Sequence, residues 1–295
     1  MINNKRDFAL RQKASSIKTI SDLVDCINFI LRSYLRYHSV AISLSDVRNY
    51  SNLDDPGRYD VFHIPKKKKG EIRTISAPKG NLMTILRELN LLLSNCYLPP
   101  RFVTGFVYSS SVVDNARFHV GKGFVLNIDM KNFFDSIPYD MVIRRLTLPP
   151  FSFPMQVATA IANMSFLKSP ENDRLVLAQG SPISPVLSNI YCESLDNDLY
   201  ALSLQHNVIY SRYADDITFS SDYNVFTSDS QFYKSMEWSI QANGLKVNES
   251  KVRLQDMHHR QSVTGLTVNV KVNVTRKYIK DLRNLLYIWT VSYTH

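Results

Sequence analysis

The sequence predicts an α+β fold in which helices cover one face of a central antiparallel sheet. Apolar side chains recur at helical spacing in several long segments. Elsewhere, short runs of strand-forming residues are separated by turn residues such as Gly, Asn and Asp. The chain has 295 residues, of which 44% are hydrophobic, so it can bury a substantial core or two or three small subdomains.

The N-terminal part of the chain is expected to form two helices and a hairpin. Ser21 can cap the first helix, which extends to Leu35. The second helix begins at Leu82 and ends before Pro99, because the residue before a proline disfavours helical geometry. Between the helices, two strand-like runs flank a series of lysines, which indicates a hairpin with a basic tip. These two strands span 61–65 and 72–76.

The middle of the chain combines a buried strand, a helix and a second hairpin. Residues 124–129 are an apolar run rich in strand formers, and the run ends at the carboxylate of Asp129. A helix is expected after the turn at Gln179 and Gly180. Further on, Ala214-Asp215-Asp216 lies between two strand-like runs, which predicts a hairpin with an acidic turn. This helix spans 183–202, and the two strands span 208–213 and 217–220.

The C-terminal part is expected to contain a helix over 230–242 and a turn at Asn243 and Gly244. Residues 261–273 are strand-like, and residues 275–289 have the spacing of a final helix.

Charge and cysteine content restrict the class of protein. The formal net charge of +9 attracts polyanions, most simply nucleic acid, although many basic proteins bind none. The three cysteines form no CxxC pair, so neither a disulfide framework nor a zinc site is indicated. No stretch approaches the ~18 apolar residues of a membrane span, so we expect no membrane partner and a cytoplasmic location.

Three carboxylates are the candidate catalytic groups. Phosphoryl transfer to a sugar hydroxyl needs charge neutralisation, which two divalent ions supply when shared carboxylates hold them. Asp129 ends a strand and Asp215-Asp216 lies in a hairpin turn, so adjacent strands would bring all three together. Oxygen ligands of this kind suit magnesium. The alternative is a solvated acidic turn without function, which is common for paired aspartates.

These residues resemble a known family. Tyr213-Ala-Asp-Asp216 is similar to the fifth sequence block of reverse transcriptases, and Asp129 followed by Phe133-Phe134 resembles the first aspartate block of the polymerase palm. Further segments resemble the remaining blocks in the correct order. They are Lys66 to Pro78 for the fingers block, Gln179 to Pro185 and Gly244 to Lys251 for the two blocks that flank the acidic turn, and Val263-Thr-Gly265 for the primer grip.

The resemblance implies a right-hand polymerase with fingers, a palm built on an antiparallel sheet, and a short thumb. Residues 1–120 would form the fingers with an N-terminal helical segment, and residues 121–272 the palm, with a fingers insertion around 140–180. Residues 273–295 would form a thumb that is short or incomplete, because a retron thumb usually continues further.

Two motifs are similar to those of bacterial retron enzymes. Asn115-Ala-Arg-Phe-His119 resembles their Asn-Ala-x-x-His motif, and Val263-Thr-Gly265 their Val-Thr-Gly motif. The resemblance implies an RNA-directed DNA polymerase that copies a structured noncoding RNA into single-stranded DNA of the msDNA type, primed from a 2′-hydroxyl of that RNA. It also implies an RNA–DNA complex, an accessory effector protein and a role in antiphage defence.

Other functions remain open at this point. The chain could be another compact bacterial defence reverse transcriptase, or an RNA-binding scaffold that has lost polymerisation. The three retained aspartates argue against a scaffold, which has no need to hold like charges together. An RNA-templated RNA polymerase is disfavoured by Phe134 and Ala214 in the family context.

The resemblance also implies a role for each candidate residue. Two magnesium ions would be held by Asp129, Asp215 and Asp216. The dNTP would be bound by Arg73, Lys68, Phe134, Gln179, Gly180 and Lys251, with Phe134 against the sugar and Lys251 as proton donor to pyrophosphate. RNA would be bound by Asn115, His119, Val263, Thr264, Gly265 and Arg283.

Each of these roles has an ordinary alternative. A run of lysines is usually solvated, and Phe134 can be a core residue. Lys251 can be a surface lysine, and Asn115 and His119 can be structural, because two-metal chemistry requires no imidazole. The final helix, with Arg283, can simply be amphipathic and packed on its leucines.

Overall fold

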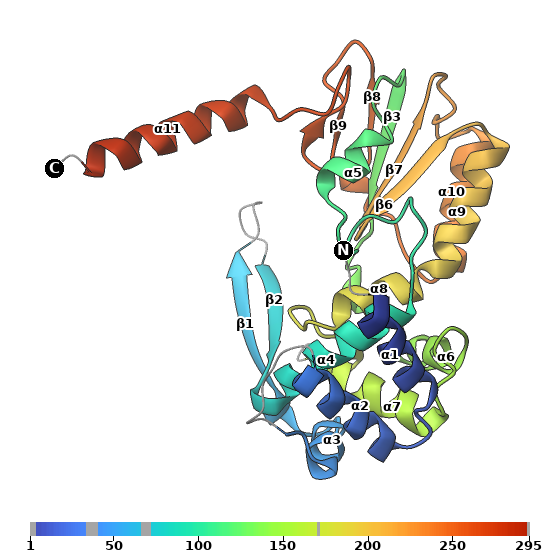
Figure 1. Cartoon of the computed structure of the whole chain (residues 1–295). Helices are drawn as coiled ribbons and strands as arrows, with labels where there is room; N and C mark the ends of the chain where they lie inside the picture. Colours follow the sequence, from blue (N-terminus) through green and yellow to red (C-terminus); the bar gives the residue numbers. More distant parts are fainter. Residues whose placement is uncertain (1–3, 34–40, 66–71, 170–171, 294–295) are drawn as a thin grey trace. The chain divides into compact units, whose positions relative to one another are not determined.

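The computed structural model describes residues 4–33, 41–65, 72–169 and 172–293 (Figure 1). The chain divides into two compact units. Unit 1 contains residues 1–99 and 132–193, and unit 2 contains residues 100–131 and 194–295. Unit 2 begins before residue 121, where we placed the start of the palm, and residues 132–193 include the expected insertion. The assignment of fingers, palm and thumb stays a prediction.

Unit 1 is mainly helical, with α4 at its centre. The apolar face of α4 is fully buried and contacts α1, α2, α7 and α8. Its described elements are α1 (Asn4–Ser15), α2 (Ile20–Ser33), α3 (Leu44–Tyr50), β1 (Tyr59–Pro65), β2 (Ile72–Pro78), α4 (Gly80–Cys96), α6 (Tyr139–Thr147), α7 (Met155–Ser165), β4 (Phe166–Lys168), β5 (Leu175–Leu177) and α8 (Ser184–Tyr191), with short 3₁₀ turns at Pro56–Arg58 and Phe134–Ser136.

A buried arginine joins several of these elements in unit 1. Arg58 is 2% exposed, and its guanidinium donates to the carbonyls of Tyr50 at 2.9 Å and Asn163 at 2.7 Å. It also donates to the carbonyl of Phe166 at 3.2 Å. Burying a charged group costs free energy unless hydrogen bonds replace those it made to water. These three carbonyls therefore allow the Arg58 guanidinium to be buried.

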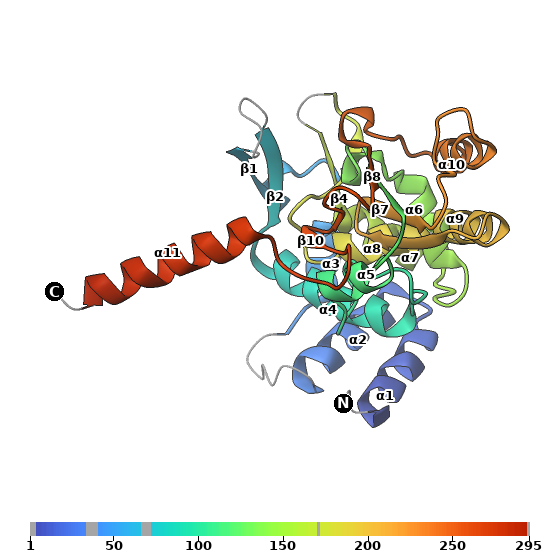
Figure 2. The ribbon, with the colours of Figure 1, turned by 90° about the horizontal axis from the view of Figure 1, so that it is seen from above.

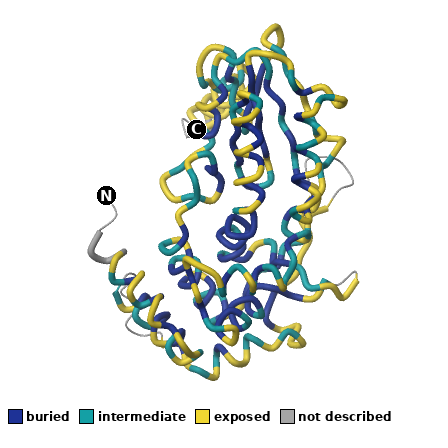
Figure 3. Tube along the Cα trace, turned by 90° about the vertical axis from the view of Figure 1, so that its right-hand side faces the viewer, coloured by how far each residue is buried: buried dark blue, intermediate teal, exposed yellow. Residues whose placement is uncertain are grey.

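Unit 2 is built on a four-stranded antiparallel sheet with strand order β6-β7-β3-β8. Its elements are α5 (Val112–Arg117), β3 (Phe124–Asp129), α9 (Glu193–Gln205), β6 (Ile209–Tyr213), β7 (Asp216–Ser221), α10 (Gln231–Ala242), β8 (Arg253–Asp256), β9 (Ser262–Val263), β10 (Leu266–Thr267) and α11 (Arg276–Tyr293), with a 3₁₀ turn at Glu249–Lys251. Figure 3 shows the buried residues in dark blue along the Cα trace, on both strands and helices.

Opposite faces of this sheet contact different helices, as the alternation of side chains along each strand requires. On one face, the ring centroids of Phe219 on β7 and Phe232 on α10 lie 5.1 Å apart. On the same face, the Tyr210 hydroxyl of β6 donates a hydrogen bond to Asp196 of α9. On the other face, α5 contacts β6, and His119 follows α5 (Figure 1). The arrangement is the expected α+β fold, although helices cover both faces rather than one.

Most predicted elements form close to their expected bounds. The helix that ends before Pro99, the strand over 124–129 and the acidic hairpin are confirmed. The helix over 230–242 is confirmed too, and Ser230 caps it by accepting from the Tyr233 backbone N–H at 3.1 Å. The two strands of the basic hairpin pair as expected, and its tip at 66–70 lies outside the described residues.

Several details of the predicted elements were wrong. The first helix begins at Ile20, because Thr19, not Ser21, accepts the capping hydrogen bond from the Asp22 backbone N–H at 3.2 Å. The helix expected over 183–202 forms as two, separated at Cys192, where ψ is −2°. Strand β8 was not anticipated. Residues 261–273 form only two short strands and a bridge between Thr267 and Asn273.

The last helix, α11, extends away from the rest of unit 2 (Figures 1 and 2). Its leucines are exposed, by 43% at Leu282, 64% at Leu285 and 50% at Leu286. The alternative of a helix packed through these leucines is therefore absent from the described structure. Among the described residues, no helix combines the length and the apolar character needed to span a membrane.

Glu88 on α4 makes the stability of unit 1 depend on pH. Its side chain is 2% exposed, and burial raises its pKa from 4.5 to about 7, with slight opposition from Arg87. The folded state therefore binds the proton more tightly than the unfolded state, and stability falls as pH rises from 4.5 to 7. We expect Glu88→Gln to be more stable than wild type by up to about 3 kcal/mol at pH 8, and equal to it near pH 4.

Urea unfolding followed by circular dichroism, with hydrogen exchange of the α4 amides, measures this difference. Asp25→Asn, at an exposed position of α2, is the matched control and should show no pH-dependent difference from wild type. Equal stability of Glu88→Gln and wild type at pH 8 would contradict the raised pKa.

Candidate active site

Strand pairing brings three aspartates to one end of the sheet in unit 2. The register of β3 and β7 sets Asp129 opposite Asp216. Asp215 lies in the turn between β6 and β7, and its carbonyl accepts a hydrogen bond from the Met130 backbone N–H at 3.1 Å. Main-chain hydrogen bonds thus hold together the two acidic segments that the sequence analysis singled out.

The carboxylates perturb one another's protonation. The pKa of Asp216 rises from 3.8 to about 6, mainly because neighbouring atoms displace water from its carboxylate although the residue is partly exposed, and the like charges of Asp215 and Asp129 add to the rise. Lys251 and Arg253 act in the opposite sense. Because the carboxylates repel one another, a cation that binds among them is stabilised.

Lys251 already supplies one positive charge to this cluster. Its Nζ donates to both carboxylate oxygens of Asp129, at 2.8 Å each. Partial burial acts to lower the pKa of Lys251, but the hydrogen bond to Asp129 and the charges of the three aspartates outweigh it and hold that pKa above 10.5. The ammonium is therefore protonated at neutral pH.

The donor chemistry of the cluster fits a hard divalent cation, because carboxylate oxygens are the ligands that magnesium prefers. Within the described ranges, however, no three or more His, Cys, Asp or Glu side chains are arranged to hold a metal ion. Both oxygens of Asp129 are instead bound by Lys251. The residues thus suit a metal chemically, and Asp129 would exchange its lysine partner for the ion.

Asn115 and His119 lie inside unit 2, fully buried. Asn115 Oδ1 accepts from the Thr104 hydroxyl at 2.9 Å. The two ring nitrogens of His119 contact Ser220 Oγ of β7 at 2.7 Å and Ser211 Oγ of β6 at 2.8 Å. Burial lowers the pKa of His119 to about 3, so the ring is neutral. These positions favour the structural alternative, because neither side chain is accessible to RNA.

The predicted primer grip contains one buried and two accessible residues. Val263 is fully buried in a cluster with Ala116, Val125 and Val268. Thr264 Oγ1 donates to the Val112 carbonyl at 3.1 Å. Gly265 has a φ of 84°, a left-handed conformation that suits glycine, and a Cβ added there would meet nothing within 4 Å.

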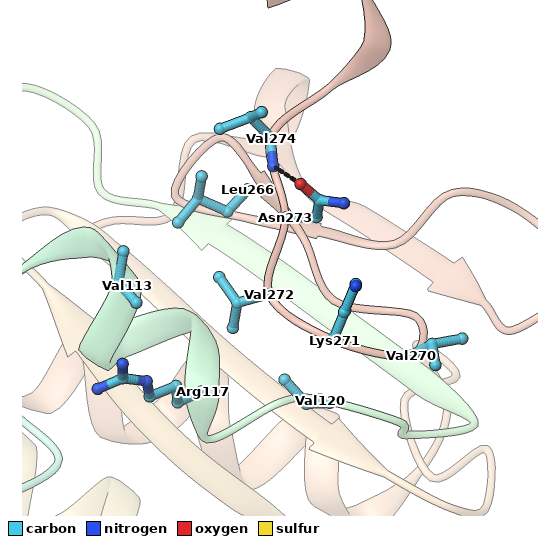
Figure 4. Close-up of a pocket in the computed structure, with 9 residues that line it drawn as sticks. All are labelled: Val113, Arg117, Val120, Leu266, Val270, Lys271, Val272, Asn273 and Val274. Atoms are coloured by element: carbon cyan, nitrogen blue, oxygen red, sulfur yellow. Dashed lines mark hydrogen bonds between the residues drawn. The ribbon is translucent and has the colours of Figure 1, made fainter. Parts of the chain in front are cut away.

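A surface hollow of about 560 Å³ lies between α5 and the loop that follows the primer grip (Figure 4). Its lining is mainly apolar, with Val113 from α5 and Val272 from the loop. Arg117 and Lys271 add positive charge to the same hollow. This hollow therefore combines apolar contact area with cations next to the Thr264 turn.

Three of the predicted nucleotide-binding residues are associated in unit 1. The Gln179 carbonyl accepts from the Ser76 backbone N–H of β2 at 2.7 Å, and Arg73 lies on the same strand. Gly180 has a φ of 115°, and a Cβ there would lie 2.8 Å from Ile75 Cγ2. Glycine is therefore required for the turn to approach β2 this closely.

The other predicted substrate-binding and RNA-binding residues, Phe134, Arg283 and Lys68, differ in where they lie. Phe134 is half-buried in unit 1, whereas its neighbour Phe133 is 4% exposed and is the core residue of the pair. The two rings meet edge to face at 5.4 Å. Arg283 lies exposed on α11, and Lys68 lies outside the described residues.

Residues 64–270 match the family model described as "Reverse transcriptase (RNA-dependent DNA polymerase)". The chain belongs to this family. The matched region includes every predicted site residue except Arg283. The α+β polymerase fold follows from this membership, and reverse transcriptases generally use divalent metal ions.

Curated relatives confirm the resemblance to retron enzymes. Retron Mx65 reverse transcriptase of Myxococcus xanthus is 31% identical over 84% of this chain and 61% of its own length. Retron Ec83 reverse transcriptase of Escherichia coli is 28% identical over 78% of this chain and 75% of its own length. A solved telomerase from Candida albicans has a TM-score of 0.49 at 13% identity, over 73% of this chain and 45% of that one, which is too weak a likeness to bear on function.

Two residues of the site were missed from the sequence. Asn248 donates from its side chain to Asp129 Oδ1 at 3.1 Å, and from its backbone to the Asp129 carbonyl at 2.8 Å. Gly105 packs so closely on the acidic hairpin that a Cβ would lie 2.1 Å from the Ala214 nitrogen. Asn248 lies within the block from Gly244 to Lys251, so its position in the sequence was a usable signal, whereas nothing near Gly105 in the sequence indicates its contact.

The buried histidine makes the stability of unit 2 fall on acidification. Because the pKa of His119 is about 3 when folded and 6.5 ordinarily, its contribution is complete above pH 6.5 and is lost as pH falls below it. Wild type should lose about 2 kcal/mol from this source between pH 7 and pH 5. His119→Gln should lack this loss.

Urea unfolding followed by tryptophan fluorescence measures the effect, because both tryptophans, Trp238 and Trp289, belong to unit 2. His258→Gln, at an exposed histidine, is the control and should retain the wild-type pH dependence. The same pH dependence in His119→Gln would show that His119 is not the group responsible.

Proposed function

We propose that this chain is an RNA-directed DNA polymerase that extends a primer by two-metal nucleotidyl transfer. The observation that supports this most strongly is the β3–β7 register, which sets Asp129 opposite Asp216 inside the region that matches reverse transcriptases. The like charges of Asp215 and Asp129, which contribute to the raised pKa of Asp216, support it further, because repulsion among the carboxylates is relieved when cations bind.

The metal ligands would be Asp129, Asp215 and Asp216, and we propose magnesium as the metal, with two ions. When bound, these ions would lower the pKa of the primer hydroxyl and neutralise charge on the transferred phosphoryl group and the leaving pyrophosphate. The protein contributes the position of the three carboxylates, which the main-chain hydrogen bond from Met130 to Asp215 helps to set.

Lys251 is proposed as the proton donor to the leaving pyrophosphate. Its pKa is held above the ordinary value by its hydrogen bond to Asp129 and by the aspartate charges, against the effect of partial burial, so it carries the proton that this role needs. Once Asp129 binds a cation instead, the ammonium would be released from the carboxylate and free to approach the phosphates.

The residues of unit 1 would bind the dNTP. Arg73 on β2 and Lys68 would contact the triphosphate, since cations neutralise charge that develops on it. Gln179 and Gly180 would lie by the nascent base pair, and Phe134 would exclude a 2′-hydroxyl. The hydrogen bond between Ser76 and Gln179 supports a common role, because it ties the turn to the strand that carries Arg73.

The template is proposed to be a structured noncoding RNA that is copied into single-stranded DNA of the msDNA type. The retron relatives and the Asn115–His119 motif support this, together with the net charge of +9. RNA would be contacted by Thr264, Gly265 and Arg283. The buried residues Asn115, His119 and Val263 would support the surface that binds the RNA without touching it. Priming from an RNA 2′-hydroxyl, an effector protein and antiphage defence belong to the same proposal.

The first test removes the metal-binding charge. Asp215→Asn/Asp216→Asn should lower magnesium-dependent dNTP incorporation on a primed RNA by about a thousandfold or more, because metal ions contribute several kcal/mol to such reactions. Asp222→Asn, whose carboxylate is exposed and pairs with Lys122, is the matched control and should remain active. A branched RNA–DNA product in the purified protein would support the retron reaction. A wild type inactive on every primed RNA would favour the scaffold.

A second test concerns the sugar. Phe134→Ala should raise incorporation of ribonucleotides relative to deoxynucleotides by about tenfold, which corresponds to about 1.4 kcal/mol. Phe8→Ala, at an exposed phenylalanine of α1 in the same unit, should leave the ratio unchanged. An unaltered ratio in Phe134→Ala would contradict the assignment of this ring as the sugar gate.

A further inference from the structure

We propose that Arg212 and Asp196 are a positioning pair that fixes the turn carrying Asp215 and Asp216. This inference rests on the proposed function, since it concerns the placement of the proposed metal ligands. Both residues are 0% exposed and belong to unit 2. Neither is among the residues that the family resemblance singled out.

The ion pair between Arg212 and Asp196 is bidentate and fully buried. Arg212 of β6 donates from Nε to Asp196 Oδ1 and from Nη2 to Asp196 Oδ2, both at 2.7 Å. The Tyr210 hydroxyl donates to Asp196 Oδ1 at 2.7 Å. This geometry fixes the plane of the guanidinium, because the two parallel hydrogen bonds allow only one orientation.

The same guanidinium also holds the acidic turn. Arg212 Nη1 donates to the Ala214 carbonyl at 3.0 Å. Ala214 directly precedes Asp215 and has a φ of 58°, a left-handed conformation that is strained for a residue with a Cβ. A hydrogen bond to its carbonyl therefore stabilises a backbone geometry that the residue would not adopt by itself.

The backbone around Arg212 is fixed as well. The Arg212 N–H donates to the Phe102 carbonyl at 2.8 Å, and the Thr104 N–H donates to the Arg212 carbonyl at 2.9 Å. Gly105 then lies against Ala214 too closely for any side chain. The turn is thus held by main chain and by the Arg212 side chain, so its position is set before any metal or nucleotide binds.

Stability alone does not account for a charged pair at this place. Replacing a buried ion pair by apolar residues of similar volume is often neutral or stabilising, whereas removing one partner is strongly destabilising. A hydrophobic pair would fill the same space between α9 and β6, but would leave the Ala214 carbonyl without this donor. The arginine therefore supplies a directional contact to the Ala214 carbonyl that an apolar pair cannot supply.

The test removes the pair without leaving a buried charge. The triple variant Arg212→Met/Asp196→Leu/Tyr210→Phe should fold, with wild-type circular dichroism and RNA affinity. Its kcat for dNTP incorporation should fall by about a hundredfold, while KM for the dNTP changes by less than about twofold, because displaced ligands affect the chemical step. Arg145→Met/Glu193→Leu, which removes a partly buried ion pair between α6 and the first residue of α9, is the matched control and should retain kcat.

A rescue variant separates backbone placement from general damage. Adding Ala214→Gly to the triple variant should recover part of the lost kcat, because glycine adopts a positive φ without strain. Arg212→Lys keeps a cation beside Asp196 but lacks the planar fork that also reaches the Ala214 carbonyl, so its kcat should fall with little loss of fold. If the triple variant does not fold, Arg212→Lys carries the test by itself.

Binding of Mn²⁺ to the protein without template or nucleotide supplies a readout that is independent of activity. Electron paramagnetic resonance should show weaker Mn²⁺ binding in the triple variant and partial recovery with Ala214→Gly. Unchanged kcat and unchanged Mn²⁺ affinity in a folded triple variant, or in Arg212→Lys, would overturn the proposal. An inactive wild type whose Mn²⁺ binding still depends on the pair would instead refute the proposed function and leave the positioning role standing.

Discussion

The antiparallel pairing of β3 with β7 is the constraint on which the candidate active site depends. It joins residues far apart in the chain and sets Asp129 directly opposite Asp216, with Asp215 in the adjoining turn. Bringing carboxylates together opposes folding, and the charges of Asp215 and Asp129 add to the effect of desolvation in raising the pKa of Asp216. The sheet must therefore be held by interactions strong enough to keep these charges in place.

Polar groups buried on both faces of the sheet supply these interactions. On one face Arg212 and Asp196 form an enclosed ion pair, and on the other neutral His119 connects β6 to β7 through two serines. Arg212, Asp196 and His119 each have hydrogen-bond partners. Buried polar groups stabilise one structure when they are hydrogen-bonded, and destabilise the fold when they are not. Lys251, whose side chain is exposed, adds a cation that binds Asp129.

Membership of the reverse transcriptase family and this local geometry support each other but answer different questions. The family match covers residues 64–270 and establishes which protein class the chain belongs to. The chain spans 61% of the length of the Myxococcus relative, so activity, template and partners are inferred from the site. Within unit 2, Asn115 and His119 are buried and bonded to neighbouring side chains, so these two motif residues support the sheet from inside.

The sequence by itself determined the elements whose signals are local. A short apolar run of strand formers predicted β3, the segment 230–242 was predicted to be the helix α10, and an acidic pair between strand-like runs predicted the hairpin that carries Asp215. The family blocks extended this to the order of the site residues. Local signals suffice for these features because each depends on neighbours within a few positions.

Only the tertiary structure decided which residues hold the aspartates in place. The partners Arg212 and Asp196, the contact of Gly105 with Ala214, and the burial of His119 all join segments that are distant in the chain or lie on different elements. Likewise, Cys192 divides a segment that reads as one continuous helix. Such features arise from long-range packing and from the loss of water around polar groups, and neither leaves a periodic pattern in the sequence.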